Sequence, residues 1–127
     1  MPERELAERL VKELHAARVR GDLAGMCGLF ANQGSFSIAG ASADKPIGIR
    51  EETLTAFKPW LSMMVKVFRL SDYELLSLVV EWPKAAAHWR VKINSKVTGI
   101  TVATELVDLI EIRDGQIASY NEFFVPR

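Results

Sequence analysis

The N-terminal part of the chain carries hydrophobic residues at helical spacing. The first set recurs every three or four positions and consists of Leu6, Leu10, Leu14 and Ala17. This spacing predicts an amphipathic helix that ends at Gly21. Asp22 is then placed to cap a second, shorter helix by accepting backbone N–H bonds. The apolar stripe of that second helix consists of Met26, Leu29 and Phe30.

A short strand and a loop precede a third predicted helix. Residues 33–39 place two apolar side chains two positions apart, which indicates a strand. Residues 40–48 contain glycine, proline and aspartate and are typical of a loop. The third helix is expected to begin at residue 49 or 50 and to run toward residue 64. Pro59 should kink this helix or end it early, because proline has no backbone N–H to donate.

The second half of the chain alternates with the period of two that is typical of strands. The predicted strands cover residues 73–82, 85–94, 100–112 and 116–125. Short turns separate the last three, and the final one is the tight-turn pair Asp114-Gly115. Strands joined by short turns pair antiparallel, so the sequence predicts an α+β fold in which helices cover one face of a sheet.

One acid lies in an otherwise apolar row of the strand 100–112. Asp108 alternates in phase with the apolar side chains of Leu106, Ile110 and Ile112. Residues two apart face the same side of a strand, so Asp108 should face the helices and lose its solvation. The functional interpretation is an acid in a pocket. The structural alternative is an acid that only hydrogen-bonds a neighbouring group.

The length of the last turn decides which residues of the final strand join Asp108. A two-residue turn places Asn121 opposite Asp108, and a three-residue turn with a glycine bulge places Tyr120 there. The second arrangement is favoured, with Tyr120 and Glu122 facing inward. A pocket with two acids and a tyrosine hydroxyl could bind and polarise a carbonyl group. In the structural alternative, Glu122 lies near the rim.

The histidines and the cysteine carry weaker signals. His88 precedes the inward-facing Trp89 and should point to the outer face of the sheet. His15 lies among charged neighbours and is predicted to be on the surface of the first helix. Two histidines on separate elements do not make a credible zinc site. Cys27 is expected to pack as a small apolar group.

Composition limits the classes of partner. The 127 residues are 49% hydrophobic and 25% charged, which suits one domain with its own core. The formal net charge is zero, so neither nucleic acid nor membrane is indicated as a partner. A single cysteine and a charged start without a signal-peptide core favour the cytoplasm. No glycine-rich phosphate loop is present in the sequence, so no nucleotide cofactor is indicated.

The outer face of the predicted sheet combines charges with apolar residues. Arg90 and Lys92 should pair across strands with Glu105 and Glu111. Val107 and Leu109 lie between those two acids. A face of this kind suits the interface of a homodimer.

Several short motifs, in this order and spacing, resemble the nuclear transport factor 2-like (NTF2-like) superfamily. They are Arg20-Gly21-Asp22-Leu23, Leu29-Phe30-Ala31, Gly48-Ile49-Arg50-Glu51, Asp108 with Arg113-Asp114-Gly115-Gln116-Ile117, and the ending Ser119-Tyr120-Asn121-Glu122-Phe123-Phe124. The chain is most similar to the SnoaL-like and ketosteroid isomerase-like members, over essentially residues 1–127. The resemblance implies a single NTF2-like cone, with three N-terminal helices packed on a strongly curved, mostly antiparallel sheet. It also implies an apolar pocket at the wide end and dimers formed through the outer sheet face.

The chemistry that the resemblance implies is only partly matched. Ketosteroid isomerases need a tyrosine and a base at positions that fall on Leu14 and Ile38, and only their oxyanion aspartic acid has a match, at Asp108. Limonene epoxide hydrolases have a carboxylate that falls on Glu122, but the nearest match to their second element, Arg90-Val91-Lys92, ends in a cation. SnoaL-type polyketide cyclases use one acid/base aspartate in an apolar pocket, which Asp108 could supply.

The sequence therefore predicts a protein that binds a small apolar, carbonyl-bearing molecule and leaves open whether it turns that molecule over. Isomerase, cyclase or hydratase chemistry would use Asp108, Glu122 and Tyr120. No metal or other cofactor is expected. The alternatives are a non-catalytic dimeric ligand-binding or scaffold module, and an epoxide hydrolase-like enzyme that uses Glu122. The residues expected to line the pocket are Phe30, Trp60, Met63, Met64, Trp89 and Phe124.

Overall fold

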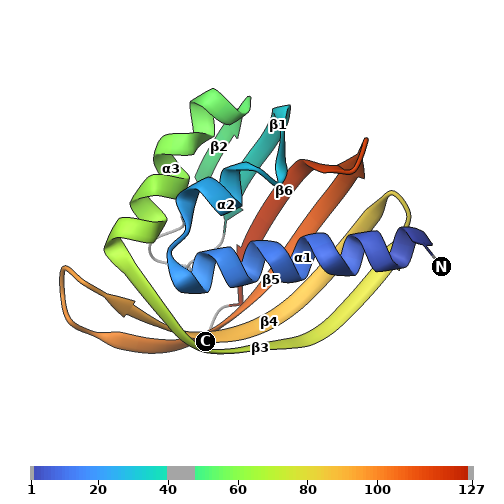
Figure 1. The fold of residues 1–127 in the computed structure, drawn as a ribbon. Coiled ribbons are helices and arrows are strands. Elements are labelled where there is room, and N and C mark those ends of the chain that lie inside the picture. The colour runs from blue at the N-terminus through green and yellow to red at the C-terminus, as the bar shows by residue number, and fades with distance from the viewer. Residues whose placement is uncertain (1, 40–47, 126–127) are drawn as a thin grey trace.

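Three helices lie on one face of a curved six-stranded sheet (Figure 1). The computed structural model describes residues 2–39 and 48–125. In chain order the elements are α1 (Pro2–Arg20), α2 (Leu23–Cys27), β1 (Phe30–Ala39), β2 (Gly48–Glu52), α3 (Leu54–Val67), β3 (Phe68–Glu81), β4 (Lys84–Ser95), β5 (Thr101–Arg113) and β6 (Gln116–Phe124).

The strand order is β2-β1-β6-β5-β4-β3, and only the β1–β6 pair is parallel. Register shifts in β3 accompany the bend of β3 and β4 beneath α1 (Figure 1). The predicted α+β cone, with three helices on a mostly antiparallel sheet, is confirmed. No helix in the described part of the chain is long and apolar enough to cross a membrane.

The third helix begins later and runs further than predicted. Residues expected in its first turn form β2 instead, which pairs antiparallel with β1. Thr53 then caps α3, since its side-chain oxygen accepts a hydrogen bond from the N–H of Ala56 at 3.3 Å. Pro59 does not end the helix, which continues to Val67 because its inward face is buried on the core. Residues 40–47 of the predicted loop 40–48 lie outside the described residues, and Gly48 begins β2.

The second predicted helix is shorter than expected. Asp22 caps α2 as predicted, with its side chain accepting from the N–H of Gly25 at 2.9 Å. The helix ends at Cys27, and Phe30 begins β1 rather than completing a helical stripe. Cys27 is half-buried against the core, as expected of a small apolar group.

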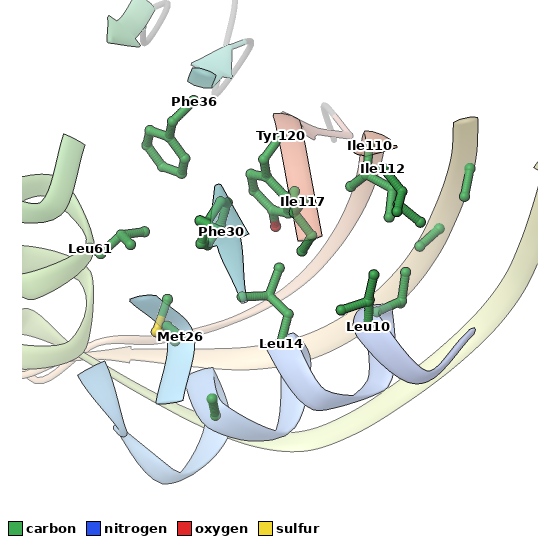
Figure 2. Packing of buried hydrophobic residues seen from close by; sticks show 14 of the residues in the cluster. Leu10, Leu14, Met26, Phe30, Phe36, Leu61, Ile110, Ile112, Ile117 and Tyr120 are labelled. Carbon is green, nitrogen blue, oxygen red and sulfur yellow. The ribbon is translucent and has the colours of Figure 1, made fainter. Parts of the chain in front are cut away.

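The main core lies between α1, α3 and the concave side of the sheet. Figure 2 shows side chains from the helices meeting aromatic and aliphatic side chains from β1, β5 and β6. Phe36 is stacked between Phe57 and Tyr120, with ring centroids 5.4 and 5.8 Å away. Tyr120 therefore belongs to the packing of the core as well as to its polar edge.

The turn between β5 and β6 has two residues, yet neither predicted register is observed. Asp114 and Gly115 both have positive φ, at 53° and 75°, as a type I′ turn requires. Ala118 is an extra residue in β6, because Ile117 pairs with Ile112 and Ser119 with Glu111. This bulge shifts the pairing by one residue and places Glu122 opposite Asp108. Tyr120 and Glu122 face inward, as the favoured arrangement predicts, but the cause is the bulge in β6 and not a three-residue turn.

The charged residues of the outer sheet face form other ion pairs than predicted. Arg90 pairs with Glu74 at 2.5 Å and Lys92 with Asp72 at 3.0 Å, both on β3. Glu105 pairs with His88 at 2.9 Å. The prediction considered only β5 as the neighbour of β4, whereas β3 on the other side offers acids to the same face. His88 does lie away from the core, as expected.

Candidate functional site

A cavity of about 440 Å³ opens between the helices and the sheet. Its polar lining side chains are Arg18, Ser95, Thr98, Thr104 and Glu122. Its other lining residues are apolar: Met26, Ile38, Ile49, Met63, Met64, Val65, Phe68, Leu70, Ile93, Ile100, Val102 and Phe124. The size and the apolar walls suit a small organic molecule.

The predicted lining is partly wrong. Met63, Met64 and Phe124 line the cavity, but Phe30, Trp60 and Trp89 do not. Phe30 packs edge-on against the aromatic rings of the main core, and Trp60 packs half-buried against that core. Trp89 is fully buried beneath α1. These three large rings are used for packing.

The first group of polar residues centres on Glu122. The guanidinium Nη1 of Arg18 donates a hydrogen bond to Oε2 of Glu122, and the Tyr120 hydroxyl donates to the same oxygen at 2.8 Å. Arg18 lies above the Trp89 ring, with Cζ 5.1 Å from the ring centroid. Arg18 and Glu122 line the cavity although their side chains are only 8% and 0% exposed. The result is a buried ion pair at the wall of an apolar cavity.

Burial governs the proton affinities in this group. Loss of solvation raises the pKa of Glu122 above its ordinary value; Arg18 opposes this shift and Asp108 adds to it. Burial alone would lower the pKa of Arg18, but the neighbouring Glu122, Tyr120 and Asp108 raise it above its ordinary value. Loss of solvation also raises the pKa of Tyr120 far above its usual range. Tyr120 is therefore a hydrogen-bond donor at neutral pH and does not act as a base.

The second group of polar residues centres on His15 and corrects its predicted place on the surface. His15 is fully buried. Its Nε2 lies 2.8 Å from Oδ2 of Asp108, and its Nδ1 lies 2.6 Å from the hydroxyl of Tyr73. The His15 ring also packs on Trp89 with centroids 4.3 Å apart. Burial, with Asp108 nearby, raises the pKa of Tyr73 to about 12.

The spacing along α1 contained a signal for both residues that sequence reasoning missed. Arg18 follows Leu14 by four positions, and His15 follows the buried Val11 by four. Residues four apart lie on the same face of a helix. The apolar stripe therefore continues into two polar residues that face the sheet.

The two groups meet where β5 and β6 pair. Asp108 lies directly opposite Glu122, and both residues are 1% exposed. Asp108 does not line the cavity, since Glu122 and Arg18 lie on the cavity side. Three buried polar atoms have no hydrogen-bond partner among the described residues: Trp89 Nε1, Asp108 Oδ1 and Glu122 Oε1.

The residues of this site do not make a metal centre in the described part of the chain. No group of three His, Cys, Asp or Glu residues in residues 2–39 and 48–125 could hold a metal ion. The polar side chains of the site instead form hydrogen bonds with one another, an arrangement suited to holding and moving protons.

The chain is similar to one family model and to solved structures of the same fold. The family model of the SnoaL-like domain matches residues 11–120. A Bacillus subtilis protein provisionally named an isomerase has a TM-score of 0.86 and 20% identity, covering 98% of this chain and 90% of its own. A provisionally named polyketide cyclase from Xanthomonas campestris pv. campestris has a TM-score of 0.76 and 21% identity, covering 97% and 93%.

A third similar structure is an epoxide hydrolase from M. tuberculosis, described as LEH-like. Its TM-score is 0.76 at 13% identity, and the match covers 95% of this chain and 84% of that one. No curated protein matches the sequence. At these identities the structural matches show the fold alone.

Proposed function

Because this chain belongs to the SnoaL-like domain family, we propose that it binds a small apolar molecule with a carbonyl group in the cavity and transfers protons on it. The family and its structural neighbours support a general small-molecule-binding or catalytic role. Proteins of this fold are named isomerase, polyketide cyclase and epoxide hydrolase. The reaction class proposed here is proton transfer next to a carbonyl, as in an isomerase or cyclase.

The observation that carries this proposal is the buried pair of Arg18 and Glu122 at the wall of the cavity. A buried ion pair contributes little to stability compared with apolar residues of the same size. Its place beside an apolar cavity is therefore better explained by a ligand than by folding. In a site that excludes water, hydrogen bonds to a ligand carbonyl are stronger than in solution.

Each polar residue has a distinct proposed role. Glu122 is the catalytic residue that exchanges a proton with the ligand, because it is the carboxyl group that lines the cavity. Arg18 orients Glu122 and offers further N–H groups to a carbonyl oxygen. Asp108 lies opposite Glu122 on the next strand and the Tyr120 hydroxyl donates to Glu122; both influence the pKa of Glu122, so they are positioning residues.

The position that resemblance to ketosteroid isomerases assigns to the base cannot serve here. That position is Ile38, whose side chain lines the cavity and carries no titratable group. Proton transfer in this protein would therefore depend on Glu122, which enters from a different strand, β6.

Exchange at the carbon next to a carbonyl tests this function directly. We expect the protein to catalyse deuterium incorporation into the methyl group of 2-acetylnaphthalene in D₂O, measured by proton NMR. Glu122→Gln should lower the rate at least tenfold, because an amide neither gives up nor accepts a proton at neutral pH. Calorimetric titration with the same ketone measures binding separately.

The controls separate binding from catalysis. Met63→Trp places a large ring in the cavity wall and should abolish both binding and exchange, whereas Arg9→Trp, at a 60% exposed side chain of α1 outside the cavity lining, should change neither. Binding without exchange would identify a non-catalytic ligand-binding module. Absence of binding would contradict the proposed use of the cavity for carbonyl compounds.

We also propose that the outer sheet face pairs two copies of the chain. Val79, Ala86 and Leu109 form a cross-strand row on this face, with Val79 61% and Leu109 44% exposed. Phe123, 39% exposed and opposite Val107, extends the apolar area. A second copy would bury these side chains against one another.

Analytical ultracentrifugation tests this pairing. The wild type should sediment as a dimer, and Leu109→Lys should shift it toward monomer, since association would take the charge of the lysine out of water. Val97→Lys is the matched control, because Val97 is 79% exposed but lies on the turn between β4 and β5. A monomeric wild type at every concentration would contradict the proposed dimer.

A further inference from the structure

The two buried acids on the adjacent strands β5 and β6 each have one carboxylate oxygen that lacks a hydrogen-bond partner among the described residues. These oxygens are Oδ1 of Asp108 and Oε1 of Glu122, and no described residue donates a hydrogen bond to either. The other oxygen of each acid is satisfied: Oδ2 of Asp108 by His15, and Oε2 of Glu122 by Arg18 and Tyr120. A buried acceptor without a donor is costly, so the pair requires an explanation.

The register of the sheet brings these two acids together. Asp108 and Glu122 are directly opposite each other in the antiparallel pair β5–β6, and both side chains face the inner side. Cβ atoms of directly opposite residues are about 5 Å apart, which places two carboxyl groups within reach of each other. Asp108 also acts electrostatically on Glu122, since its charge contributes to raising the pKa of Glu122.

The charges of the cluster do not balance if both acids are ionised. Arg18 contributes one positive charge, and two carboxylates contribute two negative charges. With neutral His15, the cluster carries one excess negative charge away from water, which is unfavourable. The other groups that face the acids are Tyr73 and Tyr120, and the raised pKa values of both hydroxyls keep them neutral. One additional proton would restore neutrality.

A proton on one of the two acids would also supply a donor to the two oxygens. A proton on His15 would neutralise the cluster but would leave both acceptors without a donor. A proton on either acid provides an O–H group that the other acid can accept. Neutral His15 then donates from Nε2 to Asp108 and accepts at Nδ1 from the Tyr73 hydroxyl, which agrees with both of its contacts. Every oxygen of the two acids then has a partner.

We propose that Asp108 and Glu122 share one proton at neutral pH, as a carboxyl–carboxylate pair whose Glu122 member faces the cavity. Two negative charges on directly opposite buried residues repel each other, which favours one proton shared by the pair. The pair therefore stores an acid beside the cavity. That this proton reaches a ligand carbonyl rests on the proposed function, whereas the presence of the proton does not.

Infrared spectroscopy of the protein without ligand tests the pair. At pH 7 the wild type should show the C=O stretch of one protonated carboxyl group. The band should disappear in Asp108→Asn and also in Glu122→Gln, because either change leaves one acid balanced by Arg18. Glu105→Gln, on the outer sheet face, is the matched control and should keep the band. Nitrogen NMR should show His15 neutral, with its proton on Nε2.

Three results would overturn the shared proton. A doubly protonated His15 with no carboxyl band places the proton on the imidazole. A band that persists in folded Asp108→Asn assigns the proton to Glu122 alone. A wild type with neither a band nor a charged His15 carries no additional proton. The wild-type spectra alone detect the first and third results if a variant does not fold, and none of these measurements depends on ligand binding.

Discussion

Replacing Arg18 with methionine is expected to lower the free energy of unfolding by about 3 kcal/mol at pH 8. Methionine retains the length of the side chain and its packing on Trp89 but removes the only cation that contacts Glu122 among the described residues. Glu122 is fully buried, so its carboxylate would remain without a counter-charge. Breaking a buried ion pair from one side is much more costly than removing both partners.

The cost of Arg18→Met should depend on pH with a definite sign. The folded pKa of Glu122 is raised by burial, and Arg18 holds it lower than burial alone would. Removing Arg18 therefore raises the folded pKa further. Between the unfolded value of 4.5 and the folded pKa, the folded state binds more protons than the unfolded state. The contribution of Glu122 to stability is thus present at low pH and is lost as pH rises through the folded pKa.

Urea unfolding at pH 5 and pH 8 measures this dependence. Arg18→Met should lose more stability relative to wild type at pH 8 than at pH 5, and the double variant Arg18→Met/Glu122→Met should recover most of it. Arg20→Met is the matched control; its ion pair with Asp22 is 58% and 37% exposed, so the change should be within about 0.5 kcal/mol. Equal losses for Arg18→Met at the two pH values would contradict the role assigned to Glu122.

Trp89→Ala is expected to cost about 3–5 kcal/mol of unfolding free energy. The indole is fully buried and packs against both His15 and Arg18, the two helix residues that hold the buried acids. Its removal opens a cavity between α1 and β4. The loss should exceed that of an ordinary core residue, because two hydrogen-bonded groups lose their packing with it.

Thermal and urea unfolding of Trp89→Ala and Trp82→Ala give the comparison. Trp82 is 40% exposed, and its replacement should cost no more than about 1 kcal/mol. Trp89→Phe should be intermediate, since a smaller ring keeps part of the contact. A cost for Trp89→Ala similar to that for Trp82→Ala would show that the ring does not support His15 and Arg18.

The inward face of the last two strands was predictable, whereas its pairing was not. Asp108 stands in an apolar row of period two, so its burial follows from the pattern alone. The residue opposite Asp108 on the next strand depends on the bulge at Ala118, and no residue type in that strand indicates a bulge. A single extra residue converts an expected Tyr120 or Asn121 neighbour into Glu122.

The two helix residues of the site illustrate a different limit. The repeat of four from Leu14 and Val11 points to Arg18 and His15, but a charged residue at the end of an apolar stripe is normally solvated. Burial of such residues becomes favourable only when hydrogen-bond or charge partners are available in the interior. The partner of His15 is Asp108, 93 positions away, and the partner of Arg18 is Glu122, 104 positions away.

The amino-acid sequence by itself determined the order of helices and strands apart from β2, the inward row with its acid, and membership of a family with a cone-shaped fold. These features follow from short-range periodicity, which backbone geometry converts directly into faces of helices and strands. The tertiary structure alone decided which side chains reach the cavity, which residues of α1 meet the buried acids and which acids face each other. Those outcomes depend on register and on contacts between distant elements, whose energies no local pattern contains.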